Sequence, residues 1–184
     1  GAREEEGAWL VEKALTAAHA APALAAALRV AAREPVEDTD ADKVLECAAN
    51  CLNKLNQIFH EQVYDALFFE SDASRCISDL CQALVSSRTG MGPKLTLLRF
   101  LYSACESGQG SFQDIMVKEP FWSALQSCCR ENEEETYVND RWHANHNESS
   151  TCHSEDNNSK PSVGQNGHSV SAIARKICDK LSSI

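Results

Sequence analysis

Four side chains that can ligate a metal lie close together in one polar stretch of the sequence: His143, His146, Cys152 and His153. Imidazole and thiolate groups can complete a tetrahedral zinc site. The spacing disfavours such a site, because adjacent residues such as Cys152 and His153 cannot easily direct both side chains to one ion and no CxxC pair accompanies them. We therefore expect a polar loop and no cofactor. The alternative is a small zinc-binding or catalytic helical domain that uses residues 143–153.

Catalytic chemistry has little other support in the sequence. A cysteine nucleophile such as Cys128 or Cys129 needs a base within reach of its thiol, and most histidines lie in the polar stretch. The sequence contains no glycine-rich phosphate loop, GxSxG motif or HExxH motif. Its clustered carboxylates, as at residues 133–135, are typical of a solvated surface. We expect that the chain is not an enzyme.

The elements that carry these residues are predicted to be helices. The chain has 184 residues, of which 43% are hydrophobic, enough to bury the core of one domain over residues 1–184. Only 8 glycines and 5 prolines occur, and alanine and leucine dominate, which favours an all-α fold. The formal net charge of −10 argues against nucleic acid as the main ligand and against an anionic membrane surface.

The N-terminal part of the sequence predicts neither a membrane span nor a secretory signal. The most apolar stretch, residues 14–32, is interrupted by His19, Pro22 and Arg29, and the chain begins with an acidic rather than a basic segment. We therefore expect a cytoplasmic or nuclear protein whose nine cysteines are reduced. Four of them are expected to be buried as small hydrophobic residues: Cys47, Cys51, Cys76 and Cys81.

Helix boundaries follow from prolines, glycines and capping residues. Pro22 is expected to open a second helix after the acidic first one, and Asp40 to cap the helix that runs to Phe59. A short helix is expected at residues 61–70, followed by one that residues 71–72 cap. Further helices are expected to begin at Pro93, Ser111 and Pro120, and the last is expected over residues 170–184.

Residues 131–168 form a polar, acidic segment between two helical regions. The segment contains eight acidic and two basic residues, so it supplies 6 of the 10 net negative charges. It lacks apolar periodicity, which predicts a flexible insertion that phosphorylation could regulate. The helix after it carries an apolar stripe of Ile173, Ile177, Leu181 and Ile184. Such a stripe predicts a partner, either self-association or a following repeat of a longer protein.

The helices recur in a short, medium and long order over three trial units, residues 4–59, 60–107 and 111–184. Residues 115–125 join an apolar short helix, a turn and an alanine-leucine pair, and residues 21–24 offer a fainter version. The chain outside residues 131–168 thereby resembles armadillo-repeat proteins or the related HEAT class. The resemblance implies about three stacked units, the third of which holds the insertion, and a non-enzymatic scaffold or adaptor that binds other proteins.

Where peptide-binding armadillo proteins carry a tryptophan and an asparagine on each third helix, this sequence carries other residues. Aligning residues 48–55, 97–104 and 174–181 puts three residues at the tryptophan positions and three at the asparagine positions. These are, respectively, Asn50, Arg99 and Lys176, and Lys54, Ser103 and Lys180. The family's peptide-binding mechanism therefore does not transfer. The cations among the six residues predict a basic stripe that attracts an acidic segment of a partner protein or of this chain, although solvated lysines are the commoner case.

Two aromatic pairs are candidates for an interface or for the core: Phe68-Phe69 and Phe121-Trp122. Core packing is the commoner role for such residues. Adjacent residues on a helix point about 100° apart, so one member of Phe68-Phe69 is expected to be exposed.

Overall fold

The structure is a computed structural model that describes residues 2–35, 38–107, 110–131 and 169–183, with side chains from residue 9 onward. The described regular elements are helical, so the chain is all-α as the sequence predicts, and no strand occurs within these ranges. In chain order they are α1 (Ala2–Ala31), α2 (Thr39–Tyr64), the π-helical turn η1 (Asp65–Phe69), α3 (Ala73–Val85), α4 (Met91–Glu106), α5 (Gly110–Met116), the 121–131 helix and α7 (Val170–Ser182).

The N-terminal helix differs from the prediction at Pro22. Instead of opening a second helix, Pro22 lies inside the continuous α1. The buried stripe Ala17, Ala21, Ala25 and Leu28 keeps its helical spacing past the proline. Packing of this stripe against α2 and α3 therefore compensates for the hydrogen bond that a proline removes from a helix interior.

The start and the end of α2 show how local sequence sets its length. Asp38, rather than the expected Asp40, is the N-cap, and its carboxylate accepts hydrogen bonds from the backbone N–H groups of Asp40 and Ala41 at 2.9 and 3.2 Å. Near the other end, Phe59 has non-helical dihedral angles. The break expected after Phe59 therefore exists as a kink, and the chain continues through α2 into η1.

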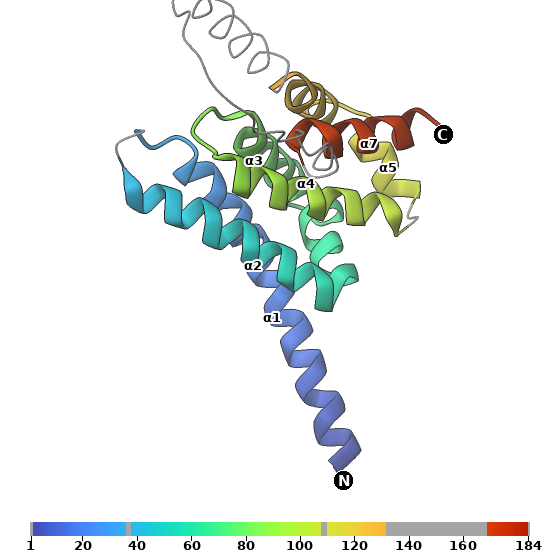
Figure 1. The fold of residues 1–184 in the computed structure, drawn as a ribbon. Coiled ribbons are helices and arrows are strands. Elements are labelled where there is room, and N and C mark those ends of the chain that lie inside the picture. Colours follow the sequence, from blue (N-terminus) through green and yellow to red (C-terminus); the bar gives the residue numbers. More distant parts are fainter. Residues whose placement is uncertain (1, 36–37, 108–109, 132–168, 184) are drawn as a thin grey trace, which may run out of the picture.

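The helices stack in two layers (Figure 1). In one layer α2 packs against α4 and α4 against α7. In the other, α3 lies between α1 and the 121–131 helix, whose Cys128 Sγ is 3.8 Å from the carbonyl oxygen of Leu84 on α3. Each layer therefore takes one helix from each successive third of the chain, and the order in space follows the order in sequence.

An aromatic cluster fills the middle of the stack. Phe68 contacts four other rings, with centroids 6.2, 6.3, 4.7 and 6.0 Å from those of Tyr64, Phe100, Phe112 and Phe121, and Tyr64 stacks on Phe112 at 5.8 Å. These rings come from α2, η1, α4, α5 and the 121–131 helix. Phe68 and Phe121 are core residues and Phe69 is exposed, so the core role and the expected exposure of one member of Phe68-Phe69 are confirmed. A role of either pair in an interface stays a prediction.

Ion pairs join helices that follow one another in the stack. Arg29 of α1 pairs with Asp79 of α3 at 3.0 Å, and Lys94 of α4 pairs with Glu131 at the end of the 121–131 helix. Arg88, after α3, pairs with Asp42 of α2 at 3.1 Å. These cations have structural partners and are not available for a ligand.

The apolar stripe of α7 is covered by this chain. Its described members Ile173, Ile177 and Leu181 are buried, and α7 packs on α4. The basis for expecting self-association or a following repeat through this stripe is therefore absent from the described part of α7. Ile184 lies outside the described residues, as does most of the 131–168 insertion.

Candidate protein-binding face

The outer faces of α2 and α4 carry four of the six predicted site residues. Asn50 and Lys54 are exposed on α2, one turn apart, and Arg99 and Ser103 are exposed on α4 with the same spacing. On both helices the first of the two exposed residues directly follows two buried residues and precedes a third by two positions. The buried residues are Ala48, Ala49 and Leu52 around Asn50, and Leu97, Leu98 and Leu101 around Arg99. The structure thus brings these four residues to equivalent positions on neighbouring helices.

On α7 the alignment of the predicted site residues is shifted by one residue. Burial along residues 173–181 follows the same order as along residues 48–56: two buried, two exposed, one buried, then intermediate, exposed, intermediate and buried. In this register Arg175 corresponds to Asn50 and Asp179 to Lys54. Lys176 and Lys180 therefore lie beside the equivalent positions rather than on them.

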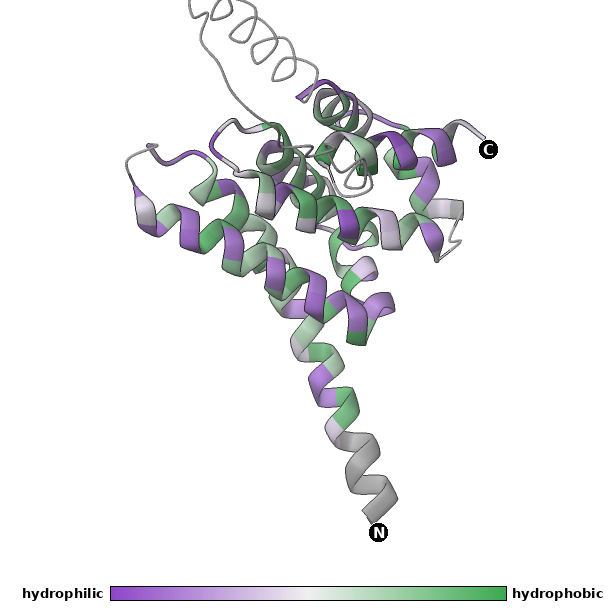
Figure 2. Cartoon of the chain, viewed as in Figure 1, coloured by the Kyte–Doolittle hydropathy of each residue, from purple (hydrophilic) through white to green (hydrophobic). Residues whose placement is uncertain are grey.

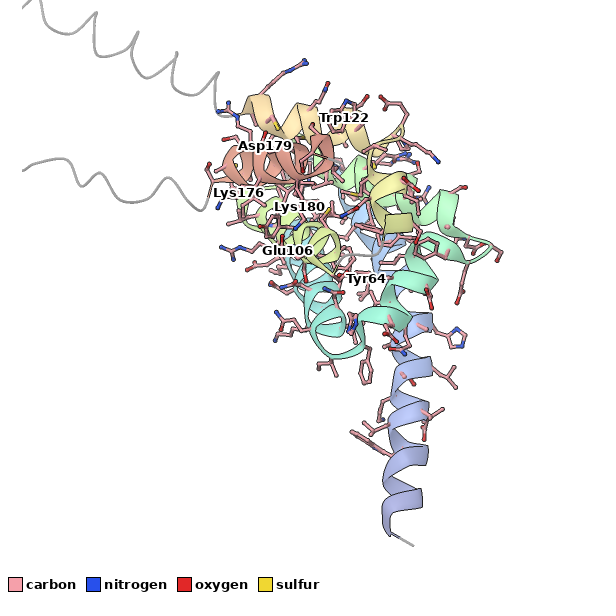
Figure 3. The ribbon with its side chains drawn as sticks, turned by 90° about the vertical axis from the view of Figure 1, so that its right-hand side faces the viewer. Tyr64, Glu106, Trp122, Lys176, Asp179 and Lys180 are labelled. Carbon is pink, nitrogen blue, oxygen red and sulfur yellow. The ribbon has the colours of Figure 1, made fainter. Side chains whose placement is uncertain are left out.

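Lys180 is engaged by the neighbouring helix. Its ammonium group pairs with the carboxylate of Glu106 on α4 (Figure 3), and its side chain is one-third exposed. The hydrogen bond and the charge of Lys180 lower the pKa of Glu106, and the same hydrogen bond raises the pKa of Lys180. Lys180 therefore anchors α7 to α4 and is not an open contact for a partner.

Ser103 also contacts a residue of its own chain. Its side chain and that of the buried Asn56 interact with the hydroxyl group of Tyr64, which opposes the rise in the Tyr64 pKa that burial causes. Figure 3 shows Tyr64 inside the stack, below α4. Ser103 thus links the outer face of α4 to a buried polar contact.

The remaining cations of the predicted stripe, Lys54, Arg99 and Lys176, are exposed. Among the described residues, no carboxylate forms an ion pair with Lys54, Arg99 or Lys176. They lie on α2, α4 and α7, the three helices of one layer. A partner's carboxylates could therefore pair with them without displacing an existing partner.

Lys54 also borders an apolar groove between α1 and α2. The groove has a volume of about 510 Å³, and Lys54 is the charged residue among those that line it. The others are Ala20, Ala23 and Leu24 of α1 and Cys51, Leu55 and Ile58 of α2. Sequence reasoning missed this groove, although Cys51, Leu55 and Ile58 recur at helical spacing on α2 and are a signal that could have located it.

The N-terminal half of α1 extends past the body of the stack (Figures 1 and 2). Trp9, Leu10, Val11 and Leu15 are each at least half exposed. Contrary to the prediction from the interrupted sequence, residues Trp9–Ala31 are long and apolar enough to cross a membrane by length and composition. Core helices of soluble proteins and signal sequences meet the same criterion, and the second half of α1 is packed into this core.

The described cysteines differ in exposure, and four of them are fully buried. Cys76 and Cys81 are buried as predicted, whereas the prediction is wrong for Cys47 and Cys51, which are exposed on the outer face of α2. Within the described ranges, no group of three or more histidine, cysteine, aspartate or glutamate side chains is placed to hold a metal. The candidate ligands at residues 143–153 lie outside those ranges.

Comparison with known proteins gives no relative: no protein-family model, no curated protein and no solved structure matches this chain.

Proposed function

We propose that this chain is an armadillo-like, non-enzymatic scaffold that binds a short acidic and apolar segment of another protein on the outer faces of α2 and α4. The observation that carries the proposal is the apolar groove between α1 and α2 with Lys54 at its border, where no described carboxylate pairs with it. Arg99, exposed on the next helix of the layer, supplies the second positive charge.

The groove and the cations are expected to bind different parts of the ligand. Apolar side chains of a partner gain free energy by leaving water for the groove, at about 25 cal/mol per Å² of buried apolar surface. Carboxylates beside them pair with Lys54 and Arg99, which fixes orientation and disfavours basic partners. The expected ligand therefore has apolar residues followed or preceded by acidic ones.

The order of the helices supports the armadillo-like part of the proposal. Helix pairs α1 and α2, α3 and α4, and the 121–131 helix and α7 follow one another in both layers, and η1 and α5 precede the second and third pairs. This order corresponds to the three units that the sequence suggests. On such a scaffold Lys54 and Ser103 replace the family's asparagines, so the proposed ligand differs from the extended peptides held by those asparagines.

A peptide selection tests the proposal with matched variants. Random short peptides are selected on the full chain, and their affinity is measured by fluorescence anisotropy. Enriched peptides should combine acidic and apolar residues and bind the double variant Lys54→Glu, Arg99→Glu at least about tenfold more weakly, because two favourable charge contacts become repulsive. Ile58→Asp should weaken binding similarly by placing a charge at the groove.

Arg75→Glu on α3 is the control, because Arg75 is exposed in the other layer and the substitution makes the same charge change as either single substitution, Lys54→Glu or Arg99→Glu. Its peptide affinity should equal that of the wild type. Equal affinities for the Lys54→Glu, Arg99→Glu variant, or peptides without acidic residues, would contradict the proposal.

The expectations about metal, nucleic acid, membrane and location in the cytoplasm or nucleus stay predictions. The alternative, a zinc-binding or catalytic domain that uses residues 143–153, is separated from the scaffold by measuring zinc in the dialysed full chain. Stoichiometric zinc would favour the alternative.

A further inference from the structure

Two thiol groups from distant parts of the sequence meet where α7 packs on the 121–131 helix. The Sγ atoms of Cys129 and Cys178 are 4.0 Å apart, and both residues are partly exposed. The two residues are 49 positions apart in the chain, so their contact depends on the docking of α7. A hydrogen bond of 3.4 Å from the Arg175 guanidinium to the carbonyl oxygen of Cys129 reinforces this docking.

The geometry is close to that of a disulfide. A disulfide requires an S–S distance of about 2.05 Å, so each sulfur must move by roughly 1 Å, which small side-chain rotations supply. Both side chains are reachable by small molecules because neither is fully buried.

The other described cysteines are less suited to this bond. Cys128, the neighbour of Cys129, is buried, and its thiol lies against the Leu84 carbonyl oxygen of α3. Cys47 and Cys51 are exposed but lie one turn apart on α2. Residues at this spacing have Cβ atoms about 5–6 Å apart, farther than the 3.5–4.5 Å that a disulfide spans.

We propose that Cys129 and Cys178 form an oxidisable dithiol site, which a small-molecule disulfide such as oxidised glutathione converts into an intramolecular disulfide. The inference is independent of the proposed ligand of the α2 and α4 faces. It assigns a covalent modification to the junction between the 121–131 helix and α7.

The reaction proceeds by two thiol–disulfide exchanges. The Cys129 thiolate attacks one sulfur of oxidised glutathione, which forms a mixed disulfide and releases one glutathione thiolate. The Cys178 thiolate then attacks the Cys129 sulfur and releases the second glutathione. The protein loses two electrons and two protons, and glutathione disulfide, the oxidant, gains them as two thiols. Burial and the neighbouring Cys129 raise the Cys178 pKa to about 12, so only a small fraction of Cys178 is thiolate and the second exchange is the slower step.

The bond would tie together the two helices that flank residues 132–168. In the reduced chain α7 is held by packing and by polar contacts such as that of Lys180 with Glu106. In the oxidised chain α7 could not separate from the 121–131 helix. Oxidation should therefore suppress local opening of α7.

The test uses the full chain in buffers of oxidised and reduced glutathione, followed by peptide mapping without reduction. The expected product is a cross-linked peptide containing Cys129 and Cys178, with the loss of two hydrogen atoms. Hydrogen exchange of the α7 amides should slow at least about tenfold on oxidation. The variant Cys178→Ser should show neither change, whereas the control variant Cys47→Ser, Cys51→Ser should show both.

The map of the wild-type protein decides the proposal even where a serine variant fails to fold. Linkage of Cys129 or Cys178 to Cys152 in place of the expected bond would overturn it. A product that stops at glutathione attached to one cysteine would do the same, as would thiols that stay reduced in oxidised glutathione.

Discussion

Removing Arg29 and removing Asp79, the two members of the ion pair between α1 and α3, should lower the free energy of unfolding by different amounts. The Asp79 side chain is 3% exposed, whereas that of Arg29 is 34% exposed. Replacing Arg29 with methionine leaves a carboxylate buried without its cation, and breaking a buried pair in this way costs about 3–5 kcal/mol. Because Arg29 is one-third exposed and water partly screens the pair, we expect about 3 kcal/mol for Arg29→Met.

Removing the carboxylate should cost less. In Asp79→Leu the guanidinium can turn toward water while its alkyl part stays packed, so we expect a loss of about 1 kcal/mol. The double variant Arg29→Met, Asp79→Leu leaves no unpaired charge and should resemble Asp79→Leu alone. The double-mutant cycle should therefore give a coupling of about 2–3 kcal/mol.

Urea unfolding followed by far-UV circular dichroism measures these free energies by linear extrapolation. Lys43→Met is the control, because Lys43 and Asp40 form an ion pair with both side chains more than three-quarters exposed. It should change stability by less than about 0.5 kcal/mol. The reasoning is refuted where Arg29→Met costs no more than Lys43→Met, or where the costs of Arg29→Met and Asp79→Leu simply add.

Three further predictions concern other contacts. The Glu106 pKa lies below its ordinary 4.5, so the pair with Lys180 stabilises fully above pH 4.5 and loses its effect as pH falls through the lowered value; the difference in urea midpoint between wild type and Lys180→Met should vanish in acid. Tyr64→Phe should cost about 1–2 kcal/mol in urea unfolding because it removes the buried hydroxyl group that interacts with Asn56 and Ser103, and an unchanged midpoint would contradict this. Trp9→Ser should alter the unfolding free energy by less than about 0.5 kcal/mol because the ring is 55% exposed, and a larger loss would show that the ring packs on the body.

The helices could be predicted because apolar spacing and capping residues are local features. The expected helix after Pro120 and the one after residue 168 both exist, and Ser169 caps the latter. The prediction that Pro22 opens a second helix is wrong, because the buried alanine stripe from Ala17 to Ala25 continues in phase on both sides of the proline. Tertiary packing outweighed the local cost of that proline.

The exposed positions of the candidate site could be predicted from the sequence only on helices whose apolar residues are also the buried ones. Leucines and alanines fix the outward direction of α2 and α4, and Asn50 and Arg99 were placed accordingly. On α7 the alignment places Ala174 at the position of Ala48. The burial of Ile173 and Ile177 shows that the equivalent register lies one residue earlier. The groove beside Lys54 depends on how α1 crosses α2, which helical periodicity alone does not determine.

The aromatic cluster around Phe68 has a consequence for how this chain unfolds. Arrays of stacked helices often lose structure one unit at a time, from an end inward. Here Tyr64, Phe100, Phe112 and Phe121 surround one ring, so the second and third thirds of the chain share a single nucleus. The elements that carry these rings should melt in one cooperative step, whereas the outer end of α1 and α7, which contribute no ring to the cluster, can open separately.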